Sequence, residues 1–186
     1  MKKIVTTLLI MALVFSFAGC GSKDSGKESQ TTTAAQEETR PEMTQTLEDI
    51  VELIYAEHPV AFSLATIPVD LADPDSYTTY TGLTDISGVE EAVASEAMIG
   101  AIPYSMALVR VKDGTDTEAL AQDMAAGINP RKWICVEADD LSVAASGNLV
   151  MLVMIGTEYS DSATSEQMVT AFETVCGGLD VKLINP

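Results

Sequence analysis

Cys20 is the residue whose surroundings most clearly predict a chemical event. It follows Phe17-Ala18-Gly19, and small residues directly before a cysteine are typical of the site at which bacterial lipoproteins are acylated. Two lysines and an apolar run up to residue 18 precede it, and the run is shorter than the roughly 20 residues of a spanning helix. We therefore predict that residues 1–19 are a signal peptide. The thiol of Cys20 would then bear palmitate and hold the chain on the extracytoplasmic face of the cell membrane.

A second set of residues that could bind a ligand is cationic. Four of the five basic residues after residue 45 lie within one 23-residue span, and the only tryptophan follows them directly. The set comprises Arg110, Lys112, Arg131, Lys132 and Trp133. Arginine beside an exposed indole is common at interfaces and can also hold an anion, so Arg110, Arg131, Lys132 and Trp133 form a candidate site for a partner or an anion. The alternative is that the indole packs in the core and the charges belong to a solvated turn.

Side chains that support catalysis are scarce. The single histidine, His58, precedes a proline at a predicted helix end, where the helix dipole explains it without a catalytic role. The sequence has no Gly-x-Ser-x-Gly, His-Glu-x-x-His or Cys-x-x-Cys motif. Glu137, Asp139 and Asp140 leave a carboxylate-dependent hydrolase as an alternative, because paired carboxylates can perform acid–base chemistry. We expect no cofactor and favour a protein that is not an enzyme.

A calcium-binding domain is a further alternative. Asp70, Asp73 and Asp75 fall in one loop, and Glu137 to Asp140 supply three more acids in another. Neither loop has the ligand spacing of an EF-hand, which places six or more oxygens around the ion. We therefore expect no metal site in this chain.

Cys135 and Cys176 are the cysteines that would remain after lipidation of Cys20. Two thiols in an exported protein can oxidise, so a disulfide between them is one alternative. Their spacing matches no disulfide framework, and two small buried thiols are the other alternative. Mass spectrometry with and without reductant distinguishes the two.

The charge of the mature chain restricts its partners. Removal of residues 1–19 takes away two lysines and no acids, which leaves 8 basic and 28 acidic residues and a net charge of −20. Such a chain is repelled by nucleic acid and by anionic lipid. Apart from the membrane that holds the lipid anchor, we expect a neutral or cationic partner, such as an envelope protein or an exported peptide, and no nucleic acid.

Composition divides the chain after the signal peptide into two parts. Residues 20–45 are the lipidated cysteine and a linker, which we predict to be flexible because it has no aromatic residue and too few apolar ones to form a core. Residues 46–186 are long enough for a single domain. Thr46 to Asp49 resembles a capping box, and apolar residues at helical spacing follow it up to Pro59. Residues 72–82 are rich in turn formers and hold at most a short helix.

A first strand–strand–helix unit is predicted from residue 89 onward. Tyr104 to Lys112 is typical of a strand, and Val89 to Met98 is its expected hairpin partner. The alanines and glutamates of Val89 to Met98 fit a helix equally well, but the strand at Tyr104 to Lys112 needs a neighbour. Thr115 to Glu118 resembles a capping box and predicts the helix that follows.

A second unit repeats this order. Leu141 to Ala145 and Leu149 to Ile155 flank Ser146-Gly147-Asn148, a compact hairpin signal, and Asp161 or Ser162 would cap the next helix. The unbroken apolar run of Leu149 to Ile155 is typical of a strand buried on both sides or inside a sheet. Together the units predict an α+β fold, an antiparallel four-stranded sheet with helices on one face, preceded by an N-terminal helix.

Three stretches of the chain resemble an uncharacterised family of domains in small lipoproteins of Gram-positive, mostly anaerobic, bacteria. They are Tyr104 to Gly114, Asn129 to Val136 and Ser146 to Met154. The string Pro-Arg-Lys-Trp-Ile-Cys-Val in the second is the most distinctive, and the resemblance extends over roughly residues 47–175. It implies an α+β domain anchored on the outside of a Gram-positive cell envelope. It implies no activity and no catalytic residue.

Overall fold

The computed structural model describes residues 43–186. Its helices and strands, in chain order, are α1 (Leu47–Glu57), β1 (Leu64–Pro68), α2 (Pro74–Thr81), β2 (Val89–Ala97), β3 (Tyr104–Val111), α3 (Thr117–Gly127), β4 (Asp140–Ser146), β5 (Leu149–Ile155), a 3₁₀ turn η1 (Thr157–Tyr159), α4 (Ser165–Cys176) and β6 (Val181–Ile184). The predicted signal peptide, Cys20 and the linker up to residue 42 lie outside the described residues. Within residues 43–186, no helix has the length and hydropathy needed to cross a bilayer.

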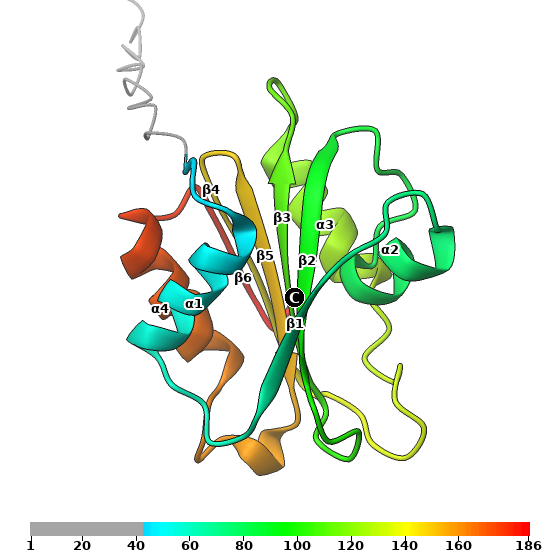
Figure 1. Ribbon diagram of the computed structural model, residues 1–186, viewed down its shortest axis with the longest axis vertical. Helices are drawn as coiled ribbons and strands as arrows, with labels where there is room; N and C mark the ends of the chain where they lie inside the picture. The colour runs from blue at the N-terminus through cyan, green and yellow to red at the C-terminus, as the bar shows by residue number, and fades with distance from the viewer. Residues whose placement is uncertain (1–42) are drawn as a thin grey trace, which may run out of the picture. The chain divides into compact units, whose positions relative to one another are not determined.

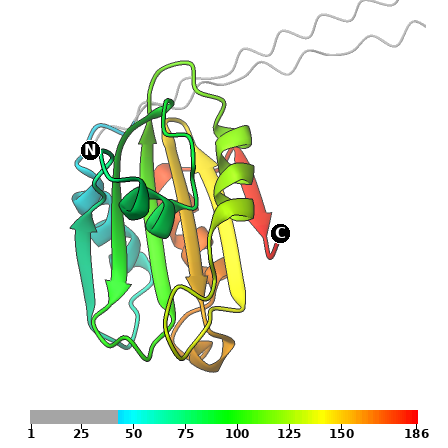
Figure 2. The same ribbon diagram turned by 90° about the vertical axis from the view of Figure 1, so that its right-hand side faces the viewer.

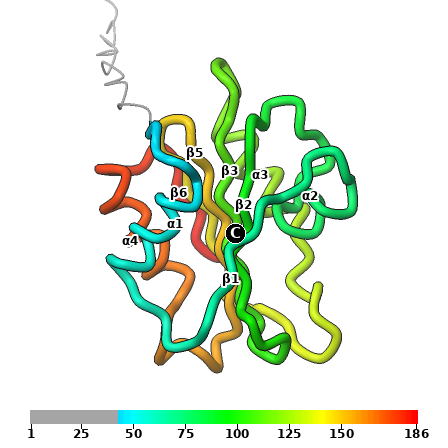
Figure 3. Tube along the Cα trace, viewed as in Figure 1, coloured from blue at the N-terminus to red at the C-terminus, as the bar shows by residue number. Residues whose placement is uncertain are grey.

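All six strands form one antiparallel sheet in the order β1-β2-β3-β5-β4-β6. Helices α1 and α4 lie on one face of the sheet and α2 and α3 on the other (Figure 1 and Figure 3). The α+β class, the antiparallel sheet and the N-terminal helix are as predicted. The prediction of four strands was wrong, and so was the prediction that all helices cover one face.

The two strands that the sequence did not predict lie at the edges of the sheet. Edge strand β1 has five residues, of which only Leu64 is partly buried, and β6 has four. Such short strands give almost no alternation of apolar and polar residues. The bonds Met98 N–H to Ser63 O (2.9 Å) and Val69 N–H to Ala92 O (2.9 Å) place the backbone nitrogen of Pro68 on the outer side of β1. A proline is tolerated there and removes a donor from the exposed edge.

The two long crossovers explain why the helices lie on opposite faces. Strand β3 is connected through α3 to β4, which is parallel to it with β5 in between, and β5 is connected through α4 to β6 across β4. Both connections move the chain the same way across the sheet, but they start from strands that run in opposite directions. Crossovers of the same hand therefore place α3 on one face and α4 on the other.

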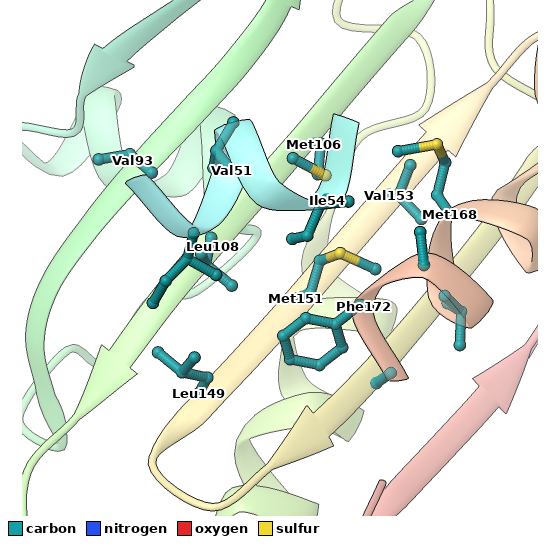
Figure 4. Close-up of a cluster of buried hydrophobic side chains, with 14 of the residues drawn as sticks. Val51, Ile54, Val93, Met106, Leu108, Leu149, Met151, Val153, Met168 and Phe172 are labelled. Carbon is teal, nitrogen blue, oxygen red and sulfur yellow. The ribbon is translucent and has the colours of Figure 1, made fainter. Parts of the chain in front are cut away.

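Helices on both faces give the sheet two cores, and β5 contributes to each. Leu149, Met151 and Val153 pack beneath α1 and α4 with Phe172, as Figure 4 shows. The alternate residues of β5, including Leu152, pack beneath α2 and α3. Because successive side chains of a strand point to opposite faces, a strand with two cores is apolar at every position. All seven residues of β5 are buried, which accounts for the unbroken apolar run in the sequence.

Most predicted element boundaries agree with the structure, and the caps of two helices differ. Thr46 caps α1 and accepts the N–H of Asp49, and β2 is a strand paired with β3, as expected. Helix α3 is capped by Asp116 rather than Thr115. Helix α4 is capped by Thr164, in a capping box with its third residue, and not by Asp161 or Ser162, because η1 and a further turn occupy the chain before it. The hairpin between β4 and β5 is the predicted one.

Candidate functional site

Three loops meet at one end of the sheet, which we call the loop end. They are residues 98–103, 129–139 and 156–164, and they lie together at the lower edge of Figure 2. The Gly156 N–H donates to the carbonyl of Pro103 (3.0 Å), and the Tyr159 hydroxyl donates to the carbonyl of Ala101 (3.3 Å). These bonds join the third loop to the first.

Lys132 fixes the second loop to the sheet. Its ammonium group donates to Glu96 Oε1 (2.7 Å) on β2 and to Ser105 Oγ (2.9 Å) on β3, and the Ser105 hydroxyl donates to the same carboxylate. The lysine side chain is only 8% exposed and that of Glu96 is 20% exposed. The ammonium also lies 4.8 Å from the ring centroid of Tyr80 and 5.3 Å from that of Trp133. Burial lowers the pKa of Lys132, and the carboxylate of Glu96 opposes that shift.

A serine hydrogen-bonded to a lysine is a known way to activate a nucleophile, but this pair is arranged for structure. The Ser105 side chain is fully buried, so no substrate can reach its hydroxyl. The Glu96 carboxylate accepts hydrogen bonds from both Lys132 and Ser105, so both side chains are held by a residue of β2. The described geometry therefore makes Lys132 a clamp for the loop of residues 129–139.

The clamped loop presents an isoleucine to solvent. Trp133 is partly buried against the α2 and α3 core, as the packing alternative expects, but the next residue, Ile134, is 100% exposed. On the first loop, Met98 is 68% exposed and Ile99 is 59% exposed. Full burial of one such side chain is worth roughly 1.5–3 kcal/mol, so burial of these three side chains by a partner would contribute to binding. We call Met98, Ile99 and Ile134 the loop-end patch.

The clamp also limits how far apart the two parts of the loop-end patch can lie. Met98 follows Glu96 by two residues, and Ile134 follows Lys132 by two residues. Glu96 and Lys132 are bonded to each other, and two residues of extended chain span at most about 7 Å. The sequence analysis did not identify these residues as a binding surface, although Met98 ends a predicted strand and Ile134 lies in the Pro-Arg-Lys-Trp-Ile-Cys-Val string.

Arg110 and Arg131 do not join Lys132 in one site, so the predicted cationic cluster is wrong in part. Arg110 is five residues along β3 from Ser105, about 17 Å at 3.3–3.4 Å per residue, and points to the α1 side. There it pairs with Glu91 and donates to the backbone carbonyl of Gln45. Arg131 is exposed and pairs with Glu137 of its own loop.

The carboxylates that could have served a hydrolase have structural partners. Glu137 pairs with Arg131, and Asp139 accepts the N–H (2.7 Å) and the hydroxyl (2.8 Å) of Thr157. Those hydrogen bonds hold the pKa of Asp139 below its usual range. Asp140 accepts the backbone N–H of Ser165 (2.8 Å) and its hydroxyl, at the start of α4.

The calcium alternative also finds no support in the geometry. Asp70 Oδ1 accepts the N–H of Ala72 (2.9 Å), and Asp73 caps α2 by accepting the N–H of Asp75 (3.1 Å). Among residues 43–186, no group of three or more His, Cys, Asp or Glu side chains is placed to hold a metal ion.

The two cysteines of the domain are far apart in the fold. Cys135 is exposed on the loop of residues 129–139, whereas Cys176 ends α4 and packs against the core on the opposite face. They are not bonded to each other, and a disulfide requires Cα atoms within about 7 Å. The structure thus does not join the two cysteines, and Cys135 is not a buried thiol.

An open pocket of about 430 Å³ lies between the end of α1 and α4 and includes His58. Its threonines are already used, since Thr170 and Thr174 donate to helix carbonyls one turn earlier. Thr164 and Gln167 are likewise engaged with each other in the capping box of α4. Its other polar groups include Glu57, Glu166 and the buried Nε2 of His58, which has no hydrogen-bond partner among the described residues.

Three hydroxyls form a chain on the α1 face near the loop end. The Tyr55 hydroxyl donates to Ser95 Oγ (2.9 Å) and lies 3.0 Å from the hydroxyl of Tyr104, which is fully buried. Burial is the main cause that raises the pKa of Tyr55 to about 12.

This shift predicts a pH dependence with a definite sign. A pKa raised on folding stabilises the folded state fully below pH 10, and the contribution is lost as the pH rises through about 12. The difference in the free energy of unfolding between wild type and Tyr55→Phe should therefore shift in favour of the variant between pH 9 and pH 11.5. Urea unfolding followed by circular dichroism measures it, and a difference that stays constant with pH would contradict the assignment.

Comparisons of the chain with models of protein families, with curated proteins and with solved structures give no match. The resemblance to a family of small lipoproteins accordingly stays a prediction. Function has to be inferred from the geometry of the loop end.

Proposed function

We propose that this chain is a lipid-anchored, extracytoplasmic binding module that attaches to another protein of the cell envelope through the loop-end patch. The single observation that supports this most strongly is Ile134, a fully exposed isoleucine on a loop fixed by a buried ion pair. Apolar side chains gathered on one exposed surface are characteristic of protein interfaces. We propose a role in binding or assembly, and not in catalysis, because the polar side chains of Lys132, Ser105, Asp139 and Asp140 at the loop end are buried or structurally engaged.

The Lys132 clamp supports a docking role, because it orders the loop before a partner arrives. Ordering a loop on binding costs roughly 0.5–1.5 kcal/mol for each side chain that becomes fixed. In this domain the bonds from Lys132 to Glu96 and Ser105 already hold residues 129–139 against the sheet. A preformed apolar tip binds with a smaller loss of entropy than a mobile one.

The position of the domain's first described residues favours a protein partner over the anchoring membrane. Gln45 accepts a hydrogen bond from Arg110, so the chain enters the domain at the end of β3 opposite to the Ser105 and Lys132 contact. Gln45 thus lies toward the end of the sheet opposite to the loop-end patch. The net charge of −20 also disfavours contact with anionic lipid.

The anchor is tested by replacing Cys20 with serine. We expect wild type to incorporate radiolabelled palmitate and to fractionate with membranes, and Cys20→Ser to incorporate no label. Membrane association that is unchanged in the variant would refute lipid anchoring at this residue.

The docking role is tested by the size of the complex in detergent extracts of the native membrane. We expect wild type to migrate in native electrophoresis as a species larger than the monomer, and Ile134→Asp to shift to the monomer position. Leu53→Asp is the matched control, because Leu53 is an exposed aliphatic residue (44%) on α1. If Ile134→Asp and wild type migrate alike, the patch is not the docking surface.

A further inference from the structure

The charges around the loop-end patch are mostly negative. Glu158 and Asp161 on the loop of residues 156–164 are exposed, and so are Glu137 and Asp139 on the loop of residues 129–139. The basic residues of the three loops are Arg131, which is paired with Glu137, and Lys132, which is buried against Glu96. Because the pair of Arg131 and Glu137 is neutral as a whole, the negative charge of the outward-facing rim comes from Asp139, Glu158 and Asp161.

Asp139 holds part of this negative charge in a fixed place. Its carboxylate accepts two hydrogen bonds from Thr157, and these keep it ionised and join the second and third loops. The loop of residues 98–103 contributes no charged residue, only the apolar side chains of the patch. An apolar centre thus lies beside an ordered acidic border.

We propose that the partner presents a cationic amphipathic segment, whose apolar side chains cover Met98, Ile99 and Ile134 while its lysines or arginines face the acidic rim. This inference rests on the proposed docking function and specifies its partner. Complementary charges at a rim accelerate association and exclude partners of the wrong sign, while the apolar centre supplies most of the affinity. An anionic bilayer, the other apolar surface available outside the cell, meets the same acidic rim and is repelled.

The test uses the mature chain from residue 20 with Cys20→Ser, which contains both cores because they are built from residues 43–186. The probe is a fluorescein-labelled 18-residue helical peptide of leucine and lysine, with a leucine and glutamine peptide of the same pattern as its neutral counterpart. Fluorescence anisotropy at 150 mM NaCl measures the dissociation constants. We expect the lysine peptide to bind at least tenfold more tightly than the glutamine peptide.

Three variants locate the binding. Ile134→Ser should raise the dissociation constant of the lysine peptide at least tenfold. Leu53→Ser should change that dissociation constant less than twofold. The double variant Glu158→Gln, Asp161→Asn should raise the dissociation constant of the lysine peptide severalfold and leave that of the glutamine peptide unchanged. That loss should shrink at 500 mM NaCl, because exposed charges are screened.

The outcomes separate this inference from the proposed function. Equal binding of the two peptides, with sensitivity to Ile134→Ser, would overturn the cationic partner and leave docking through the patch in place. Binding of the lysine peptide that is insensitive to Ile134→Ser would show general attraction to an acidic protein and overturn the inference. No binding of either peptide, together with flotation on phosphatidylglycerol vesicles that Ile134→Ser abolishes, would replace a protein partner with a lipid surface and overturn both.

Discussion

Replacing Lys132 with methionine is expected to destabilise the domain by about 3 kcal/mol, because it removes one partner of a buried ion pair and leaves the other charged. Methionine fills the space of the aliphatic stem but lacks the ammonium group that lies near the rings of Tyr80 and Trp133, so the loss reports mainly on charge. Glu96, which is 20% exposed, would keep only the Ser105 hydroxyl as a partner. The loop of residues 129–139 would also lose its attachment to β2 and β3.

Urea unfolding at pH 7 measures this loss. Arg131→Met is the matched control, since Arg131 is the neighbouring cation in an exposed pair, and such pairs contribute less than about 1 kcal/mol. Adding Glu96→Gln to Lys132→Met should restore part of the stability, because the uncompensated charge is gone. Equal stability of Lys132→Met and wild type would show that the clamp contributes nothing.

Gly82→Ala is expected to destabilise the domain by at least about 2 kcal/mol, since it combines backbone strain with a collision. Gly82 ends α2 at a φ of +77°, where residues other than glycine are strained. A Cβ atom there would lie 2.4 Å from the backbone nitrogen of Ile128 and 2.7 Å from the carbonyl oxygen of Met124. These are backbone atoms at the end of α3, so α2 and α3 would have to separate.

Gly177→Ala isolates the strain from the collision. Gly177 ends α4 at a φ of +76°, and no atom lies within 4 Å of the position its Cβ would take. Gly177→Ala should lower the free energy of unfolding by only roughly 1–2 kcal/mol, the cost of placing a residue with a side chain in the left-handed conformation. Thermal unfolding of both variants tests the comparison, which fails if Gly177→Ala is as destabilising as Gly82→Ala.

The central strands could be predicted from the sequence, but the edge strands and the strand order could not. Strands β3, β4 and β5 have strong local patterns and compact turns, so their positions were evident. Edge strands β1 and β6 gain their structure from hydrogen bonds to a neighbour that is distant in sequence. The all-apolar β5 was itself a sign that both faces are covered, but assigning the helices to faces requires the strand order, which only tertiary contacts define.

The residues of the candidate site could be predicted where residue type alone marked them, but not where their partners are distant in sequence. Lys132 and Trp133 stood out by residue type, yet the partners that define the clamp, Glu96 and Ser105, lie 36 and 27 residues away. Arg110 was grouped with Lys132 and Trp133 only because they are close in the sequence. In the structure, most of the length of β3 separates Arg110 from them. Ile134 was overlooked because an aliphatic residue in a loop has no chemical signature until its exposure is known.

The most direct test of the docking surface places a photo-reactive benzoylphenylalanine at position 134, or at position 53 as control, in the full chain expressed in its own cells. We expect ultraviolet light to produce one discrete cross-linked protein species from position 134 and none from position 53. A species of the same size from both positions, or the absence of any species from position 134, would contradict a partner bound at the loop-end patch.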